Sequence, residues 1–559
     1  MKPGMKILWL DINSSYSHSS VALPAIHAQV RDVSQWEWCV VHGTINDDPG
    51  SLAAAVAAHN PDMIASTFWL FTHRMQVEVL SRVVQLLDDV KVVCGGPEFL
   101  GDNEDFLRRN RFVTAVLRGE GEFSFPDLLR NSDNPSGWSS VDGLCWISSE
   151  DGAYHDNGIA KVHDFASLHY PEESPFFNWD KPFVQLETAR GCFNTCAFCV
   201  SGGDKPVRNQ TMEQVKVRLE NICAHGIRDV RVLDRTFNHD ISRACRMLDL
   251  FAEYSPKMRF HLEIHPSLLN PAFKERIAAL PAGLLHLEAG IQSLDSKVLQ
   301  ACGRKGSVPT SLDGLEYLCS LDNVQIHADL IAGLPEYDLD MLCNDIETLV
   351  KMGVDELQVE SLKVLPGTQM RKDADAKGLK YSPLPPYEIL QTPLMNPSEL
   401  KMAMQISRMV DLYYNCPAWQ KITARLITEH KGFIKEFTGH LKSSMVLDSP
   451  VSAERRGVIL HEYCRTHYPQ LLTDVSVAWI SAGFSLKKEP AGNIVKIKHI
   501  DSIIETDTCD ICIEYGEADP TYRYYLLNSG DRQVLFGYDS KVHSPYPTFM
   551  ATIVSRHTA

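Results

Sequence analysis

Residues 188–208 read TARGCFNTCAFCVSGGDKPVR and place three cysteines, Cys192, Cys196 and Cys199, within eight positions of the chain. Three residues separate the first pair and two residues separate the second pair. A structural zinc site usually has four protein ligands, and a disulfide uses two thiols. Three clustered thiols without an evident fourth therefore favour a site in which one ligand comes from outside the protein.

The surroundings of these cysteines favour an iron–sulfur cluster. Three thiolates can hold three irons of a [4Fe–4S] cube and leave the fourth iron open to a non-protein ligand. An apolar segment at residues 183–189 predicts a strand before the loop, and α/β barrels place their chemistry at this end of a strand. Glycines at residues 191 and 202–203 let backbone N–H groups approach the cluster sulfurs. A zinc site with a distant fourth ligand is the alternative.

Strand patterns alternate with helical patterns after the cysteine loop, as in a parallel α/β fold. The strand patterns lie at residues 183–189, 229–237, 259–266, 284–292, 324–334 and 356–365. Six βα units exceed a minimal Rossmann sheet and fall short of an eightfold barrel. We therefore predict a central partial (β/α)6 TIM barrel over residues 181–385.

The remaining chain divides into three further parts. Residues 1–135 alternate strand and helix patterns and predict an α/β, Rossmann-like doubly wound sheet. Residues 136–180 are rich in Ser, Asp, Asn, Gly and Pro and predict a linker with one hairpin-like stretch at residues 143–155. Residues 386–559 predict a C-terminal α+β domain, in which SVAWISAGF at residues 476–484 has the composition of a strand.

Composition excludes several broad classes of function. The 559 residues are 44% apolar and carry a formal charge of −17, which describes an acidic globular protein. Such a surface repels phosphate backbones, so nucleic-acid binding is disfavoured. Because no apolar run reaches about 18 residues and no signal peptide is evident, we expect a cytoplasmic protein without a membrane span. The fifteen cysteines are then expected to stay reduced.

The CxxxCxxC spacing after the first strand of a βα barrel resembles the radical S-adenosylmethionine (SAM) superfamily. The resemblance implies that Cys192, Cys196 and Cys199 bind a [4Fe–4S] cluster whose open iron is chelated by SAM. It also implies that SAM is cleaved to a 5′-deoxyadenosyl radical, which abstracts a hydrogen atom from the substrate. Phe198 matches the family's aromatic position near the SAM adenine.

Other barrel segments are similar to the family's SAM-binding segments. HADLIAGLPE at residues 327–336 resembles the fifth-strand pattern G-x-I-x-G-x-x-E, although Asp329 replaces the first glycine. LEAGIQSLD at residues 287–295 resembles the fourth-strand segment, and LKVLPGTQM at residues 362–370 resembles the sixth. The SAM-binding residues implied by this resemblance are Phe198, Glu263, Gln292, Ser293, Ile331, Gly333 and Leu365. A turn role for Gly333 and an ion-pair role for Glu263 are the alternatives.

The N-terminal sheet resembles the cobalamin-binding domain of cobalamin-dependent radical SAM enzymes. CGGPE at residues 94–98 and GEGE at residues 119–122 each follow a predicted strand, and glycines there let the backbone approach a flat ligand. The resemblance implies a cobalamin site formed by Asn13, Ser15, His18, Gly95, Gly96, Pro97, Glu98, Gly119 and Glu120.

No D-x-H-x-x-G motif supplies a cobalt-binding histidine in this sequence. We expect His18 to hydrogen-bond the ligand rather than coordinate cobalt, and His73 is a second candidate of the same kind. A domain that keeps the fold without the cofactor is the alternative.

The resemblance as a whole implies a cobalamin-dependent methyltransferase that acts on an unactivated carbon. A small-molecule or peptide substrate and a reductant of the flavodoxin or ferredoxin type are the expected partners. A radical rearrangement or cyclisation without methyl transfer, and a non-catalytic sensor or maturation protein, are the alternatives. The C-terminal region resembles an uncharacterised domain found on some of these proteins. Its pair Cys509 and Cys512 is interpreted as two ordinary strand cysteines.

Overall fold

The computed structural model describes residues 5–30, 36–132, 134–497, 509–529, 532–542 and 544–555. The chain forms two compact units. The first unit contains residues 1–342 and 360–400, and the second contains residues 343–359 and 401–559. The predicted N-terminal sheet and most of the predicted barrel therefore lie together in the first unit. The four-part division at residues 135, 180 and 385 remains a prediction.

The N-terminal sheet has the strand order β2-β1-β3-β4-β5-β6-β7, and its first five strands are parallel. These strands are β1 (Met5–Asn13), β2 (Trp36–Thr44), β3 (Met63–Thr67), β4 (Lys91–Gly95) and β5 (Ala115–Leu117). The order reverses between β1 and β3, which is the point where open α/β sheets bind ligands outside the strands' carboxyl ends.

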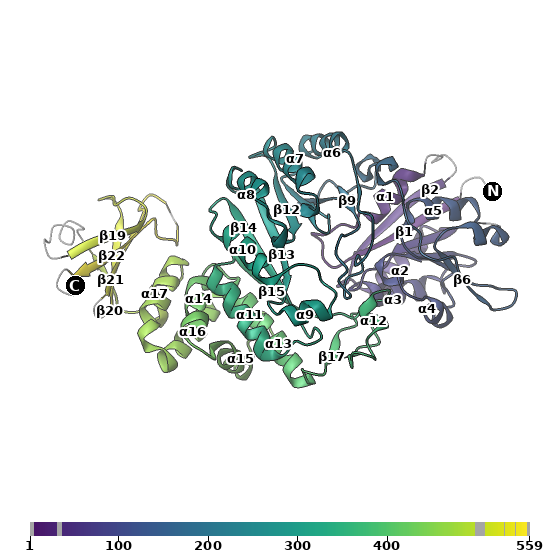
Figure 1. Cartoon of the computed structure of the whole chain (residues 1–559). Helices are drawn as coiled ribbons and strands as arrows, with labels where there is room; N and C mark the ends of the chain where they lie inside the picture. The colour runs from purple at the N-terminus through teal and green to yellow at the C-terminus, as the bar shows by residue number, and fades with distance from the viewer. Residues whose placement is uncertain are drawn as a thin grey trace. The chain divides into compact units, whose positions relative to one another are not determined.

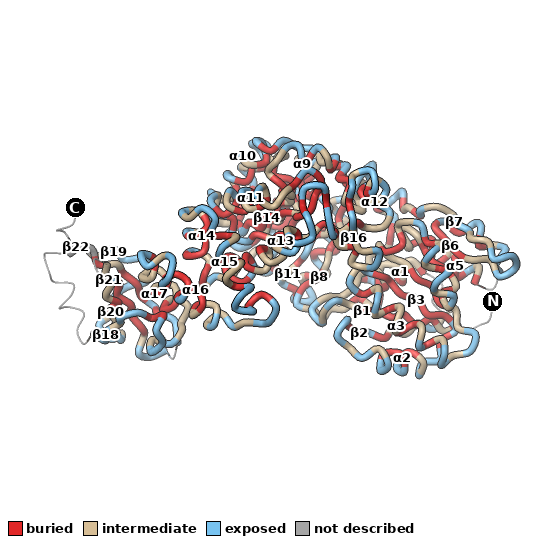
Figure 2. Tube along the Cα trace, turned by 90° about the horizontal axis from the view of Figure 1, so that it is seen from below, coloured by how far each residue is buried: buried red, intermediate tan, exposed pale blue. Residues whose placement is uncertain are grey.

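Helices cover both faces of this sheet, as the alternating sequence pattern predicts. Two apolar clusters separate the layers, one with the helix residues Leu52, Val56 and Val79 and one with Leu23 and Phe125. The helices are α1 (Ala22–Gln29), α2 (Pro49–Ala58), α3 (His73–Val83), α4 (Glu104–Arg109) and α5 (Gly121–Arg130). Figure 2 shows the buried segments along these strands and on the inner sides of the helices. The doubly wound architecture is confirmed.

The prediction that residues 136–180 form a linker with little structure is wrong for its first part. The hairpin expected at residues 143–155 is present as β6 (Leu144–Ile147) and β7 (Tyr154–Asp156), and β6 pairs antiparallel with β5. Leu144 and Trp146 join the apolar cluster of α1 and α5. The hairpin therefore extends the N-terminal sheet, because its alternate apolar residues complete a core that the five parallel strands leave open.

The central sheet has six strands in the order β15-β14-β13-β12-β11-β8 and is open rather than closed. The strands are β8 (Phe183–Leu186), β11 (Asp229–Val232), β12 (Arg259–Ile264), β13 (Leu285–Gln292), β14 (Val324–Ala332) and β15 (Glu356–Ser361). Neighbouring pairs from β8 to β14 are parallel. The predicted partial (β/α)6 barrel is confirmed.

The burial pattern of β13 distinguishes the two faces of the barrel sheet. In β13 every second residue from Leu285 is buried, and the residues between them are half-buried. The buried face packs against an outer layer of helices (Figure 1), and the other face, which includes Glu288 and Glu263, lines the barrel interior. The helices between the strands are α6 (Met212–Ala224), α7 (Ile241–Ala252), α8 (Pro271–Ala278), α9 (Ser296–Ala301), α10 (Val308–Cys319) and α11 (Leu339–Met352).

Helices precede a five-stranded sheet in the second unit, which confirms the α+β prediction. The helices are α13 (Pro397–Met409), α14 (Gln420–Glu429), α15 (Phe433–Ser443), α16 (Ala453–His467) and α17 (Leu472–Ser481). The sheet has the order β18-β20-β21-β22-β19, with β18 (Ile494–Ile497), β19 (Cys509–Tyr515), β20 (Arg523–Ser529), β21 (Arg532–Tyr538) and β22 (Phe549–Ser555).

The strand predicted at residues 476–484 is wrong, because most of this segment belongs to α17. Val475, Ser476, Trp479 and Ile480 are its buried residues, and their spacing of three and four positions forms one helical face. No helix among the described residues has the length and apolar character needed to cross a bilayer.

Candidate functional site

The cysteine loop is closed at its base by a short antiparallel ladder. β9 (Ala189–Arg190) pairs with β10 (Arg208–Asn209), so residues 191–207 leave and return at the same point. Buried Asp234, which follows β11, accepts hydrogen bonds from the Thr188 and Ala189 backbone N–H groups, both at 2.8 Å. These bonds fix the start of the loop against the neighbouring strand.

The structure brings the three cysteines together as free thiols in this loop. Cys192 and Cys196 are buried and Cys199 is half-buried. The Asn194 N–H donates to Cys192 Sγ at 3.4 Å, and Arg304 Nη1 donates to Cys196 Sγ at 3.4 Å. Burial raises the pKa of Cys196, whereas the Arg304 guanidinium acts in the opposite direction. A positive charge beside a buried sulfur favours the thiolate, which is the form that binds metal.

Two glycines let the loop fold this tightly. Gly191 has a φ of 100°, and a Cβ there would lie 2.6 Å from the Asp204 carbonyl oxygen. A Cβ on Gly202 would lie 2.3 Å from the Cys196 carbonyl oxygen. Both separations are below any real carbon–oxygen contact, so neither position accepts a side chain without displacing the backbone of the cysteine loop.

Glu263 lies on the inner face of the barrel strand β12 near the cysteine loop. Its carboxylate is 3.9 Å from Arg235 Nη1. Burial raises the pKa of Glu263 to about 7, and Arg235 opposes that shift. Glu263 is therefore poised between its neutral and charged forms and can donate or accept a hydrogen bond. Its assignment to SAM remains a prediction.

Gln292 is the last residue of β13, and Ser293 follows it. Gln292 has a φ of 71° at an irregularity in the β13–β14 pairing, which is a left-handed conformation uncommon for a residue other than glycine. Ser293 is buried, and its Oγ accepts a hydrogen bond from the Asp295 N–H at 3.1 Å. Strained backbone of this kind is concentrated at ligand sites, which supports the predicted role of this strand end.

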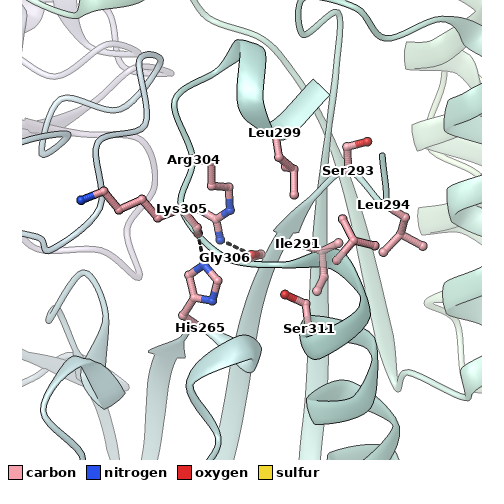
Figure 3. Close-up of a pocket in the computed structure, with 11 residues that line it drawn as sticks. His265, Ile291, Ser293, Leu294, Leu299, Arg304, Lys305, Gly306 and Ser311 are labelled. Carbon is pink, nitrogen blue, oxygen red and sulfur yellow. Dashed lines mark hydrogen bonds between the residues drawn. The ribbon is translucent and has the colours of Figure 1, made fainter. Parts of the chain in front are cut away.

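Ser293 also lines a small enclosed gap of about 10 Å³ between β13 and the residues after α9 (Figure 3). Figure 3 shows His265 directed at the Lys305 backbone, and its Nε2 lies 3.0 Å from the Lys305 carbonyl oxygen. Arg304 donates to the Gly290 carbonyl in the same view. The gap has room for about one water molecule. Its walls fix the segment that carries Arg304 to the barrel.

The other predicted SAM residues lie in the cysteine loop, in β14 and in the segments that follow the last two barrel strands. Phe198 lies between Cys196 and Cys199, and the neighbouring Ala197 carbonyl accepts a hydrogen bond from the Met370 N–H at 2.7 Å. The cysteine loop therefore contacts the segment that contains Leu365. Ile331 lies in β14, and Gly333 follows that strand with a φ of 83°. A Cβ on Gly333 would lie 2.7 Å from the Ile389 side chain. The turn role of Gly333 is therefore sufficient to explain its presence.

A large cavity of about 770 Å³ opens between the N-terminal sheet and the cysteine loop. Trp9 in the middle of β1 and the ends of β3, β4 and β5 line one side, together with Ala22 and Ala25 of α1. Gly191 and residues 200–204 of the cysteine loop line the other side. The cavity thus lies at the switch point of the sheet and reaches the loop that carries the thiols. Its volume is within the range of small-molecule and cofactor sites.

Five of the nine predicted cobalamin residues line this cavity: Gly95, Gly96, Pro97, Gly119 and Glu120. Gly96 and Gly119 both have a φ of 105°, which only glycine adopts readily. A Cβ on Gly119 would lie 2.3 Å from the Ala160 carbonyl oxygen. The two glycine motifs therefore shape the cavity through backbone that no larger residue can replace.

Asn13, Ser15, His18 and Glu98 do not line the cavity. Asn13 donates to Asp11, and Ser15 Oγ lies 2.7 Å from His18 Nδ1. Glu98 is buried, and its Oε2 lies 2.8 Å from His73 Nδ1 and accepts from the Tyr387 hydroxyl at 3.1 Å. The His73 side chain is thus bound to Glu98 rather than directed into the cavity.

Sequence reasoning missed a network of ion pairs on the cavity wall. Arg190 Nη2 lies 2.7 Å from Glu122 and 2.8 Å from Glu187, and Arg208 Nη1 lies 2.8 Å from Glu120. Glu120 and Glu122 belong to the GEGE motif, and both arginines flank the cysteine loop. The acidic residues of the GEGE motif and the arginines that flank the cysteine loop were the available signal for these ion pairs. However, residues 120 and 190 are too far apart along the chain for a sequence pattern to pair them.

Three family profiles match the chain. The radical SAM superfamily matches residues 186–349, and the B12 binding domain matches residues 9–129. A protein family of unknown function, DUF4080, matches residues 376–474. A radical SAM domain carries a [4Fe–4S] cluster and SAM, and a B12 binding domain carries cobalamin. The three free thiols, the glycines that exclude a Cβ and the cavity at the sheet edge fit these groups.

Curated relatives with these features are distantly similar. The chain is 24% identical to the cobalamin-dependent radical SAM methyltransferase TokK of Streptomyces tokunonensis, over 62% of this chain and 54% of the relative. It is 24% identical to 2-(S-pantetheinyl)-carbapenam-3-carboxylate methyltransferase of Streptantibioticus cattleyicolor, over 69% of this chain and 59% of the relative. The matched part thus spans little more than half the length of these two proteins.

Solved structures share the fold at low sequence identity. The radical SAM methyltransferase TsrM of Kitasatospora setae, with tryptophan and a SAM analogue bound, gives a TM-score of 0.56 at 16% identity, covering 70% of this chain and 80% of TsrM. The cobalamin-dependent SAM radical enzyme OxsB, with aqua-cobalamin and SAM bound, gives 0.57 at 14% identity, covering 85% of this chain and 78% of OxsB. The likeness extends across both the N-terminal sheet and the barrel.

Proposed function

We propose that this protein is a cobalamin-dependent methyltransferase acting on an unactivated carbon, because a radical SAM domain matches residues 186–349 and a B12 binding domain matches residues 9–129. The observation that carries this proposal is the 770 Å³ cavity, which the edge of the N-terminal sheet and the cysteine loop line together. Two cofactors can act on one substrate atom only where their sites open into shared space. The substrate is a small molecule or a peptide.

The cofactors supply the difficult chemistry: when bound, the cluster and SAM generate a carbon radical, and cobalamin provides the methyl group. The chain's own residues position these groups. Cys192, Cys196 and Cys199 hold the cluster, and Arg304 stabilises the thiolate of Cys196. Glu263 offers a hydrogen bond from the barrel interior beside the loop.

The ion pairs on the cavity wall fix the two sites relative to each other. Arg190 joins β9 at the base of the cysteine loop to Glu122 after β5. Arg208 joins β10 to Glu120, and also to Asp204 at 2.9 Å. These buried or half-buried pairs hold the loop against the sheet edge.

The test is anaerobic turnover of the reconstituted protein. The chain is loaded with iron, sulfide and hydroxocobalamin, reduced, and incubated with CD3-labelled SAM and a fractionated extract of small molecules and peptides. We expect 5′-deoxyadenosine, and a product whose mass increases by one methyl group bearing the label. The measurement is mass spectrometry of both products.

The alternatives give different products in the same experiment. A rearrangement or cyclisation enzyme forms 5′-deoxyadenosine and a product without the label, which would contradict methyl transfer. A sensor or maturation protein forms no 5′-deoxyadenosine under reducing conditions, which would contradict catalysis altogether. Protein in which the three cysteines are replaced by Ala is the control for cluster-independent background.

A further inference from the structure

Arg235 lines the 770 Å³ cavity and has no carboxylate within hydrogen-bond distance. It follows β11, and its side chain is 50% exposed. The nearest carboxylate oxygen, Glu263 Oε1, lies 3.9 Å from Arg235 Nη1, which is too long for a hydrogen bond. Within the described residues the guanidinium donates no hydrogen bond. Its donors are therefore available to a ligand in the cavity.

The other charged side chains that line the cavity are matched at short range. Their contacts with opposite charges, at 2.5 to 2.8 Å, are Arg190–Glu122, Arg190–Glu187, Lys161–Asp204 and Arg208–Glu120. An anion that bound at one of these arginines or at Lys161 would have to displace a carboxylate. Arg235 is the cation of the described cavity wall at which an anion binds without that cost.

The backbone around Arg235 is fixed. Buried Asp234 accepts a hydrogen bond from the Thr188 N–H at 2.8 Å, and the Thr236 hydroxyl donates to the Arg235 carbonyl at 2.7 Å. Thr236 Oγ1 also lies 3.7 Å from Cys192 Sγ. Arg235 is thus anchored one residue from a contact with a cluster ligand, and it lines the space shared with the glycine motifs of the N-terminal sheet.

We propose that Arg235 binds an anionic group of the substrate, a carboxylate or a phosphate, inside this cavity. The proposal rests on the function proposed above and narrows the substrate class to small molecules or peptides with an acidic group. A guanidinium holds its N–H donors in a planar fork that matches two oxygens of a carboxylate or phosphate. Such a contact fixes orientation as well as position. Arg235 takes no part in bond formation.

SAM and cobalamin carry anionic groups too, a carboxylate and a phosphate. Position favours the substrate, because none of the seven residues predicted to bind SAM lines the cavity that Arg235 lines. The glycine motifs predicted for cobalamin line the cavity from the sheet edge, whereas Arg235 lines it from the barrel strand β11. The experiments below separate these sources.

The first experiment tests the anion site without turnover. Phenylglyoxal modifies arginine side chains, and peptide mass spectrometry follows the rate of modification at Arg235 in the reconstituted protein. The probe is inorganic phosphate, compared with chloride at equal ionic strength. Arg246, an exposed arginine of α7 that donates to Ser242 at 2.9 Å, is the internal control.

We expect phosphate to slow the modification of Arg235 at least about threefold and to leave the rate at Arg246 unchanged, because a bound anion occupies the guanidinium. Equal slowing at both arginines, or none at Arg235, would overturn the proposal.

The second experiment identifies the source of the anion. The turnover reaction with CD3-labelled SAM is repeated with extract that anion exchange has separated into a retained anionic pool and an unretained pool. Arg235→Gln removes the charge, Arg235→Lys keeps the charge without the fork, and Arg246→Gln is the matched control. The readouts are the amount of anionic pool that half-saturates formation of labelled product, the affinity for SAM in equilibrium dialysis without extract, and the cobalt content.

Labelled product should form from the anionic pool and not from the unretained pool. In Arg235→Gln the half-saturating amount should rise at least about tenfold, since a charge-assisted contact is lost. Arg235→Lys should recover part of this loss, and Arg246→Gln should behave as the unmodified protein. SAM affinity and cobalt content should be the same in every variant.

The contrary outcomes have separate meanings. Labelled product from the unretained pool, or an unchanged half-saturating amount in Arg235→Gln, would contradict the substrate role of Arg235. Loss of SAM affinity or of cobalt in that variant would assign Arg235 to the SAM carboxylate or to the cobalamin phosphate instead. If the unmodified protein formed no labelled product with either pool, the proposed methyl transfer would be contradicted, and the phosphate experiment would still decide whether Arg235 binds an anion.

Discussion

The cysteine loop and the glycine motifs of the N-terminal sheet both follow the carboxyl ends of parallel strands, but they bind by different means. The loop offers side chains: three thiols, with Arg304 beside one of them. The sheet edge offers backbone and empty space, through glycines such as Gly96 and Gly119 at a φ of 105°. No histidine lines the cavity within the described residues.

This difference determines how each site responds to mutation. Side-chain ligands act individually, so removing them abolishes binding while the loop backbone can persist. A cavity is a collective property of many residues, and it is lost by filling it rather than by deleting one contact. The predictions below test this contrast, beginning with the largest expected effect.

Replacing Cys192, Cys196 and Cys199 together by Ala should abolish iron binding. The expected change is from about four irons per chain to a background level, because the cluster has no other protein ligands in the loop. Iron and sulfide analysis of anaerobically purified protein is the measurement. Cys512→Ser is the control, since this exposed cysteine of β19 should not alter the iron content. Four irons retained in the triple variant would refute the ligand assignment.

Filling the cavity should remove cobalamin without removing iron. Ala25 lines the cavity from α1, so Ala25→Trp places a large ring in the space that the corrin needs. Cobalamin affinity should fall by at least about tenfold, the equivalent of roughly 1.4 kcal/mol. The measurement is cobalt content and visible absorbance after incubation with hydroxocobalamin.

Ala54→Trp provides the matched change on the exposed side of α2, and it should bind cobalamin as the unmodified protein does. Unchanged affinity in Ala25→Trp would place cobalamin outside this cavity. A parallel loss of iron in that variant would show that the two sites fail together rather than separately.

Breaking the Arg190 ion pairs should destabilise the first unit. Arg190→Ala leaves the carboxylate of Glu122, whose side chain is 7% exposed, without its guanidinium. Loss of one partner of such a buried pair costs about 3 kcal/mol of unfolding free energy. Urea unfolding is the measurement. Arg109→Ala removes an ion pair with Asp105 that is almost fully exposed, and it should change stability by less than about 0.5 kcal/mol.

Acid should destabilise the barrel through His265. Burial lowers the pKa of His265 to about 4 from its usual 6.5, so the unfolded chain binds a proton that the folded chain does not bind between these pH values. Neutral His265 therefore contributes up to about 3 kcal/mol to the free energy of unfolding. This contribution is complete above pH 6.5 and is lost as the pH falls towards 4. His265→Gln should flatten the dependence of unfolding free energy on pH in this window. An unchanged slope would contradict the assignment.

The sequence predicted best those features whose evidence is local along the chain. The three cysteines lie within one short loop, so their spacing alone indicated their joint role. The alternation of apolar residues in β13 fixed both the strand and the face that reaches the barrel interior. Local patterns failed where the same residues suit two structures: residues 476–484 are rich in β-branched and aromatic residues, yet Val475 and Trp479 pack on one helical face.

Features that join distant segments were beyond sequence reasoning. Arg190 and Glu122 are 68 positions apart, and only the fold shows that they pair. The extent of the cavity could not be predicted from the sequence either. Asn13, Ser15 and His18 were therefore predicted as cobalamin residues, although they do not line the cavity. Cys509 belongs to β19, but its side chain lies outside the described residues, so the interpretation of the Cys509–Cys512 pair remains a prediction.

The most direct test of the shared-cavity account is the metal content of protein purified anaerobically with added hydroxocobalamin. We predict about four irons and one cobalt per chain, because the loop and the sheet edge each supply a complete site. Four irons with no cobalt would retain the cluster and contradict the role of the N-terminal sheet, and with it the proposal of methyl transfer.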